Sequence, residues 1–133
     1  MREILFRGKR NGYAEQRDRD WLEGSLMIGD NGECEICYGT PRVRIIYSVI
    51  PETVGQFTGA TDKNGKKIFE GDIVRVNRSE VPLIVEYSEC NCGFYADSRS
   101  DDYFSISVLN RDLVDLEVIG NIYDNPELLE AQS

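Results

Sequence analysis

The chain has 133 residues and a mass of 15.1 kDa, enough for one core or two small lobes and too little for two ordinary domains. Hydrophobic residues make up 41% and charged residues 29%, which excludes disordered and collagen-like chains. The net charge is −9, and the sequence contains no histidine, which removes the commonest general base.

Alternating apolar and polar residues predict strands in the first half of the chain. The segment 2–8 alternates in this way, and so does 21–29, where Gly24 predicts a bulge or a close approach. The segment 40–51 begins and ends near proline, as strands tend to do.

The second half continues the strand pattern and ends in a predicted helix. Alternation predicts four more strand segments, at 67–77, 82–90, 103–109 and 116–124. Residues 124–132 predict a short C-terminal helix, with Asn125 as the N-cap and Pro126 at the first helical position. The sequence therefore predicts a mainly β protein with antiparallel strands in a curled sheet or barrel.

Two segments share one order of features. Both 8–28 and 59–76 contain Asn-Gly, a charged spacer, Glu-Gly and an alternating strand. This repetition predicts two hairpins of related geometry. In the second, Asn64-Gly65 predicts a type I′ turn with positive φ, and Gly71 predicts a kink in the strand.

The four cysteines form two short motifs, C-x-x-C at Cys34 and Cys37 and C-x-C at Cys90 and Cys92. Four thiolates can make a tetrahedral zinc site, so these residues are weak metal candidates. C-x-C is not the usual zinc spacing, and Cys34 and Cys37 would face opposite ways in a strand. We expect reduced structural thiols and no cofactor.

Charge is distributed unevenly along the chain. The segments 1–19 and 63–78 each sum to +3, whereas 20–62 sums to −5 and 79–133 to −10. If the two basic segments meet, they provide a nucleic-acid interface, for which the candidates are Lys9, Arg10, Lys63, Lys66, Lys67, Arg75 and Arg78. Nucleic-acid binding is an alternative to association with proteins, and the negative charge of the other two segments disfavours it. The charge of −10 over 79–133 allows a third possibility, an acidic mimic of nucleic acid.

Three motifs resemble one family. The motifs T-V-G-Q-F-T-G (53–59), D-K-N-G (62–65) and E-G-D-I-V (70–74), together with both ends of the chain, resemble the YopX family of small phage and prophage proteins. The resemblance is weakest in 30–40 and 88–102.

The resemblance implies a single YopX-like domain over 1–133, with an N-terminal β lobe (1–50) and a C-terminal SH3-like barrel lobe (51–133). It also implies self-association into homo-oligomers, and it carries no catalytic residues.

We therefore expect a non-enzymatic phage or prophage protein that acts by self-assembly and by binding a host or phage protein. Open strand edges support association, and so do ten of the aromatic residues: Tyr13, Trp21, Tyr38, Tyr47, Tyr87, Phe94, Tyr95, Tyr103, Phe104 and Tyr123. The longest apolar run is far below the ~20 residues that span a bilayer, and the N-terminus lacks the apolar core of a leader. We expect a cytoplasmic protein of the host bacterial cell, with no membrane partner.

Overall fold

The structure is a computed structural model that describes residues 3–11, 21–77, 81–98, 103–106 and 115–130. The chain divides into two compact units, Met1–Phe57 and Thr58–Ser133. The predicted lobe boundary, between residues 50 and 51, lies earlier in the chain. Strands make up most of the described residues of both units, so the predicted mainly β class is confirmed.

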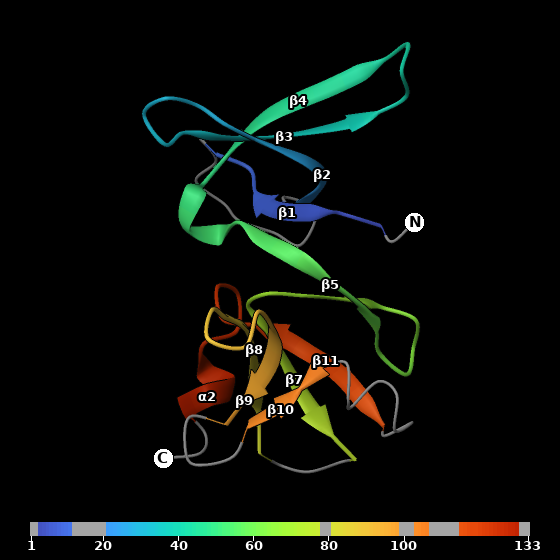
Figure 1. Cartoon of the computed structure of the whole chain (residues 1–133), viewed down its shortest axis with the longest axis vertical. Coiled ribbons are helices and arrows are strands. Elements are labelled where there is room, and N and C mark those ends of the chain that lie inside the picture. The colour runs from blue at the N-terminus through green and yellow to red at the C-terminus, as the bar shows by residue number, and fades with distance from the viewer. Residues whose placement is uncertain (1–2, 12–20, 78–80, 99–102, 107–114, 131–133) are drawn as a thin grey trace. The chain divides into compact units, whose positions relative to one another are not determined.

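The first unit is a meander of antiparallel strands (Figure 1). Its elements are β1 (Phe6–Lys9), β2 (Trp21–Ile28), β3 (Cys34–Gly39), β4 (Arg44–Val49), the 3-10 turn η2 (Pro51–Thr53) and the start of β5 (Gly55–Thr61). The sheet order in this unit is β4-β3-β2-β1-β5. β1, β2 and β3 therefore each pair with the next strand along the chain, as short connections favour, and β5 returns to pair with β1.

Side chains from three strands form the core of the first unit. Cys34, Ile36 and Val49 are buried there, and Leu26 packs against them. Cβ at position 24 would lie 2.2 Å from the carbonyl oxygen of Cys37, so the close approach predicted at Gly24 is confirmed. Glycine is needed here because any side chain would collide with the backbone of β3.

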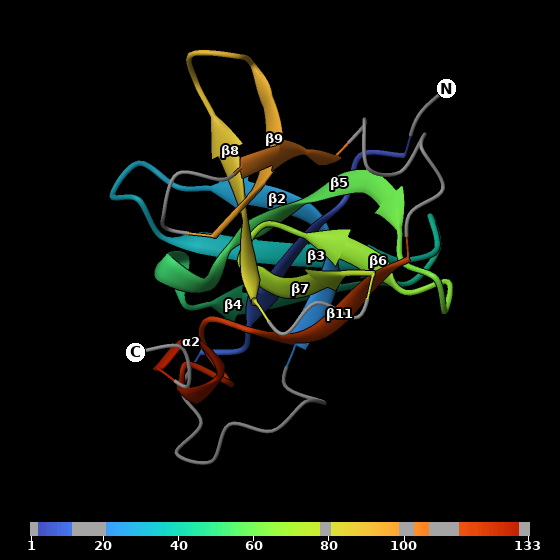
Figure 2. The ribbon, with the colours of Figure 1, turned by 90° about the horizontal axis from the view of Figure 1, so that it is seen from below.

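The second unit contains a five-stranded antiparallel sheet of order β10-β9-β8-β7-β11. Its elements after β5 are β6 (Lys67–Phe69), β7 (Asp72–Val76), β8 (Leu83–Ser88), β9 (Gly93–Asp97), β10 (Tyr103–Ser105), β11 (Leu116–Asn121) and the helix α2 (Glu127–Glu130). β6 lies next to β5, which runs from the first unit into the second. Figure 2 shows the same strands from another side.

The core of the second unit is built from residues of six strands and from Ile106, which follows β10. The buried members are Ala60, Ile68, Val74, Leu83, Val85, Ala96, Ile106 and Leu116. Leu83 and Val85 lie two positions apart on β8, so their side chains lie on the same face of the sheet. Alternation of this kind is the signal that predicted strands from the sequence.

The sheets do not close into the expected SH3-like barrel. β10 and β11 end the five-stranded order, and no pairing between them occurs in the part of the chain that the structure describes. Closure requires two terminal strands of matching length and register. β10 has only three residues, and hydrogen bonds from another loop cover the outer edge of β11.

The predicted type I′ turn at Asn64-Gly65 is wrong in one respect. Gly65 has φ +80°, as expected, but Asn64 is not among the described residues with positive φ. The amide of Gly65 donates to the carbonyl of Asp62, and the amide of Asp62 donates to the carbonyl of Lys66. This pattern is a three-residue loop with a left-handed glycine at its end, the next commonest hairpin connection.

Other predictions for the chain ends have mixed outcomes. The turn of the related hairpin, from Gly12 onward, lies outside the described residues. The C-terminal helix is present but short, and the carbonyl of Asn125 accepts the amide of Leu128. Within the described ranges, none of the helices has the length and apolar character to cross a membrane.

Gly71 provides a test of backbone geometry in the second unit. It has φ +89°, its amide donates to the carbonyl of Val85, and its carbonyl accepts the amide of Ile122. We predict that Gly71→Ala lowers the free energy of unfolding by about 1–2 kcal/mol, because a Cβ disfavours left-handed backbone.

The matched control is Gly93→Ala. Its Cβ would meet nothing closer than 3.8 Å and its φ is not positive, so the change should stay within about 0.5 kcal/mol. Urea unfolding followed by far-UV circular dichroism measures both variants. Equal stability of the two would contradict the assignment.

Candidate functional site

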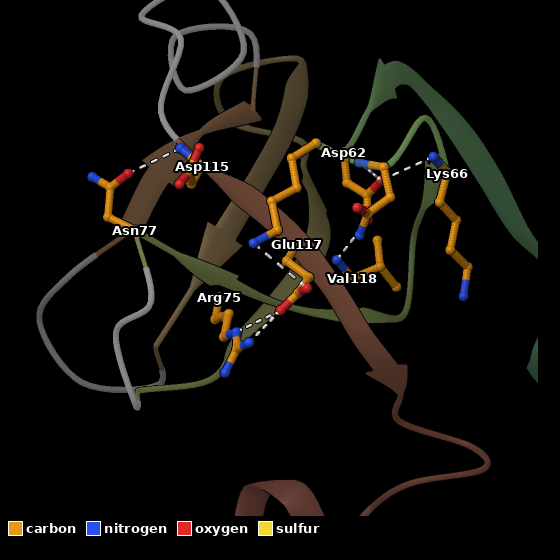
Figure 3. Close-up of polar contacts among 9 residues, drawn as sticks. Asp62, Lys66, Arg75, Asn77, Asp115, Glu117 and Val118 are labelled. Carbon is orange, nitrogen blue, oxygen red and sulfur yellow. Dashed lines mark hydrogen bonds and ion pairs between the residues drawn. The ribbon is translucent and has the colours of Figure 1, made fainter.

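Asp62 is the centre of a polar cluster in the second unit (Figure 3). Its side chain is 7% exposed, and one carboxylate oxygen accepts the amides of Asn64 at 2.9 Å and Lys66 at 2.8 Å. The other oxygen accepts the amide of Val118 at 3.0 Å. The carboxylate thus holds its own loop and joins it to a strand 56 residues later.

The Asp62 loop covers the outer edge of β11. Besides the Asp62–Val118 bond, the amide of Lys63 donates to the carbonyl of Leu116 at 2.8 Å. These are backbone groups that point away from β7 and would otherwise be free to pair with another chain. The loop therefore satisfies part of a strand edge without being a strand itself.

Charged side chains on β7 and β11 pair across the sheet. Nε of Arg75 donates to Oε1 of Glu117 at 2.6 Å, and Nη2 approaches the same oxygen at 2.5 Å. Nζ of Lys63 lies 3.7 Å from Oε2 of Glu117. One carboxylate therefore serves two of the cations predicted to contact nucleic acid.

A second buried carboxylate shapes the turn between β6 and β7. Asp72 is 1% exposed, and its Oδ2 accepts the amide of Phe69 at 2.8 Å. Glu70-Gly71-Asp72, part of the third family motif, is thus a turn held by a hydrogen bond to the carboxylate of Asp72. Buried carboxylates that accept amide hydrogen bonds in this way stabilise the local backbone conformation.

The basic residues of the first unit lie against aromatic rings. Cζ of Arg7 lies 4.7 Å and Nζ of Lys9 5.6 Å from the ring centroid of Trp21, and both side chains are buried. Cζ of Arg10 lies 3.9 Å from the ring of Tyr47. These are cation–π distances, so the contacts of these cations with the two rings stabilise the first unit.

The predicted nucleic-acid residues therefore differ in burial and in pairing. Lys9 is buried, Arg10 lies on Tyr47, and Arg75 and Lys63 face Glu117. Lys66 is exposed at the Asp62 loop, Lys67 is half-buried on β6, and Arg78 lies outside the described residues. Lys9 and Arg10 belong to one unit and the other five to the second.

The structure also separates the cysteines into two pairs. Cys34 is buried on β3 and Cys37 is half-buried three positions later, so the two face opposite sides of the strand. Cys90 and Cys92 are exposed in the second unit. Among the described residues, no three histidine, cysteine or acidic side chains form a group that could hold a metal ion.

The outer edge of β4 differs from that of β11. The amide of Asn11 donates to the carbonyl of Ser48, and the amide of Ile50 donates to the carbonyl of Lys9, on the side away from β3. Alternate residues of an antiparallel strand direct both backbone groups to the same side. Arg44 and Ile46 therefore point theirs outward as well, and no hydrogen bond in the described chain meets them there.

Exposed apolar side chains lie along the part of this edge at Arg44 and Ile46, here called the bare edge because no hydrogen bond in the described chain meets it. Val43 is 63% exposed, Ile45 37% and Ile46 49%. Their alternation places Ile46 on one face of the sheet and Ile45 on the other. The sequence pattern showed apolar residues on both faces of this strand, but it did not show that β4 ends the sheet.

Comparisons with known proteins cover nearly the whole chain. The family model described as "YopX protein" matches residues 6–130. The crystal structure of protein EF1440 from Enterococcus faecalis is 25% identical with a TM-score of 0.61, over 97% of this chain and 99% of that one. Protein yopX from Bacillus subtilis is 20% identical with a TM-score of 0.50, over 97% of both chains. No curated protein matches the chain.

The Asp62 cluster can be tested through stability. We predict that Asp62→Ala lowers the free energy of unfolding of the second unit by about 2–4 kcal/mol, because three amides lose a charged acceptor. Asp62→Asn should cost less, since it keeps one oxygen acceptor and loses the other.

The control is Glu86→Ala, an exposed acid on β8 of the same unit, which should change stability by less than about 0.5 kcal/mol. Far-UV circular dichroism is needed, because the one tryptophan, Trp21, reports the first unit. A loss for Asp62→Ala no larger than that for Glu86→Ala would show that the carboxylate does not hold the loop.

Proposed function

The chain belongs to the YopX family, and from this premise we propose a non-enzymatic protein of phage or prophage origin that acts by associating with copies of itself and with a protein partner. The observation that supports the proposal best is the bare outer edge of β4 at Arg44 and Ile46. The lack of histidine in the sequence and the structural use of Asp62 and Asp72 support a role without catalysis.

Two of the four strands that end a strand order, β4 and β11, have different edges. β11 is covered by the Asp62 loop, whereas the bare part of β4 carries Ile45 and Ile46, is preceded by Val43, and has Arg44 as its charged residue. Exposed apolar edge strands are templates for pairing with another chain. The β4 edge is therefore the surface through which we propose that association takes place.

The residues of β4 whose backbone groups point outward limit how a second copy can pair. Arg44 and Ile46 carry the outward backbone groups, while the carbonyl of Ser48 already accepts Asn11. In an antiparallel two-fold pairing, Arg44 of each copy would exchange bonds with Ile46 of the other. Ile45 would then lie opposite Ile45 of the second copy, which buries two apolar side chains.

The charge of the two units favours contact through the first. Residues 1–57 contain eight basic and nine acidic residues, a net charge of −1. Residues 58–133 contain seven and fifteen, a net charge of −8. Copies that meet through the near-neutral unit bring less like charge together than copies that meet through the acidic one.

The same edge suits a protein partner that supplies an extended strand. Such a strand gains main-chain hydrogen bonds from Arg44 and Ile46 and side-chain contacts from the flanking apolar residues. It would compete with a second copy of this chain, because both would use the same donors and acceptors. Partner binding and self-assembly would therefore exclude each other at one β4 edge.

We predict that Ile46→Lys weakens self-association by at least about tenfold, because an edge lysine opposes strand pairing and removes an apolar contact. Sedimentation equilibrium of the full chain measures the effect. Ile28→Lys is the matched control, since Ile28 is 67% exposed but lies on β2, inside the sheet order. A wild-type monomer at high concentration, or an unchanged Ile46→Lys variant, would contradict the proposal.

Nucleic-acid binding is the alternative that a separate experiment addresses. A gel shift with DNA and RNA at several salt concentrations should show only weak binding, because the basic side chains are buried, paired or divided between units. Tight binding that weakens steeply with salt would favour the alternative over self-assembly.

A further inference from the structure

The β8–β9 hairpin (Figure 2) ends in a turn that contains two exposed cysteines. Ser88 pairs with Gly93 at the end of the ladder, and the four residues between them are Glu89, Cys90, Asn91 and Cys92. Both cysteines are free and solvent-exposed. The hairpin thus presents a C-x-C motif at its tip.

The backbone of this turn is unusual at Cys92. Its φ is +52°, and Cys92 and Asn77 are the non-glycine residues with positive φ among those that the structure describes. Glycine, asparagine or aspartate normally takes this position, because a Cβ there costs about 1–2 kcal/mol. The sequence places a thiol where stability alone favours glycine.

Hydrogen bonds hold the residues around the thiols. Sγ of Cys92 lies 3.6 Å from the carbonyl oxygen of Glu89, to which it donates. The amide and the side-chain Nδ2 of Asn91 both donate to Oγ of Ser88, at 3.4 and 3.3 Å. Asn91 is therefore fixed to the start of the turn, and the thiols on either side of it remain open to solvent.

Two thiolates and an acidic neighbour make a ligand set for a soft monovalent cation. Sulfur ligands select Cu(I), which two thiolates can hold, whereas structural zinc takes four ligands. Cys34 and Cys37 do not supply a second pair of neighbouring sulfur ligands, because they face opposite sides of β3. Exposed Glu89 adds negative charge beside the thiols.

We propose that the β8–β9 turn binds one Cu(I) ion through Sγ of Cys90 and Sγ of Cys92. Two thiols lose their protons to solvent and two copper–sulfur bonds form, with no change in the oxidation state of copper or sulfur. The site is independent of the proposed association through β4, since it lies on another hairpin and in the other unit.

The test is an anaerobic titration of the full reduced chain with Cu(I) in competition with bathocuproine disulfonate. We expect one Cu(I) per chain and two sulfur ligands by X-ray absorption. Cys90→Ser and Cys92→Ser should each weaken binding by more than about a hundredfold, beyond the usual effect of changing a group outside the ligand shell. Cys37→Ser, which removes a half-buried thiol of the other unit, should bind as the wild type does.

Cys92→Gly separates loss of a ligand from loss of folding. Glycine suits φ +52°, so this variant should be at least as stable as the wild type and still fail to bind Cu(I). Undiminished Cu(I) binding by Cys92→Gly would overturn the proposal. So would stoichiometric zinc whose retention requires all four cysteines, or a wild-type chain that leaves Cu(I) with the competitor.

Discussion

The constraint on which this fold depends is that the strands at the ends of a sheet carry backbone donors and acceptors that need partners. In the second unit, the Asp62 loop supplies partners for the edge of β11. The carboxylate of Asp62 accepts the amide of Val118, and the amide of Lys63 donates to the carbonyl of Leu116. The first unit meets it only in part, where Lys9 and Asn11 bond to the end of β4. The remaining groups of β4 at Arg44 and Ile46 meet no hydrogen bond from the described residues, and the proposed association rests on this difference.

The size of the chain explains why several of its basic side chains are packed or paired. A mainly β chain of this size has little core, so long cationic side chains are used to pack and pair. Lys9 lies against Trp21, Arg10 against Tyr47, and Arg75 against Glu117. The chain as a whole, with these cations included, has a net charge of −9.

Strand alternation predicted much of the fold and missed specific parts for physical reasons. The predicted segments cover or overlap β1, β2, β4, β6, β7, β8, β10 and β11, with β6 and β7 in one segment, whereas β3, β5 and β9 were not predicted. β5 contains Gly55 and Gly59, which are typical of turns, and β3 contains two cysteines whose spacing resembles a metal motif. β9 follows the C-x-C turn and lies within a segment that reads as a loop.

The candidate site was predictable only where it is local. Asp62 followed by Asn64-Gly65 is typical of a side chain that accepts amides of its own loop, and Gly65 takes the expected positive φ. The bond to Val118 depends on tertiary structure, and no spacing in the sequence indicates it. The bare edge of β4 likewise follows from sheet order, which alternation does not specify.

The bond between Asp62 and Val118 also has a consequence for synthesis on the ribosome. The two residues are 56 positions apart, so at roughly 5–20 residues per second the nascent chain carries Asp62 for about 3–11 seconds before Val118 is translated. During that interval the carboxylate can accept only the nearby amides of Asn64 and Lys66. The hairpin can therefore form before β11 is covered, because the covering requires Val118.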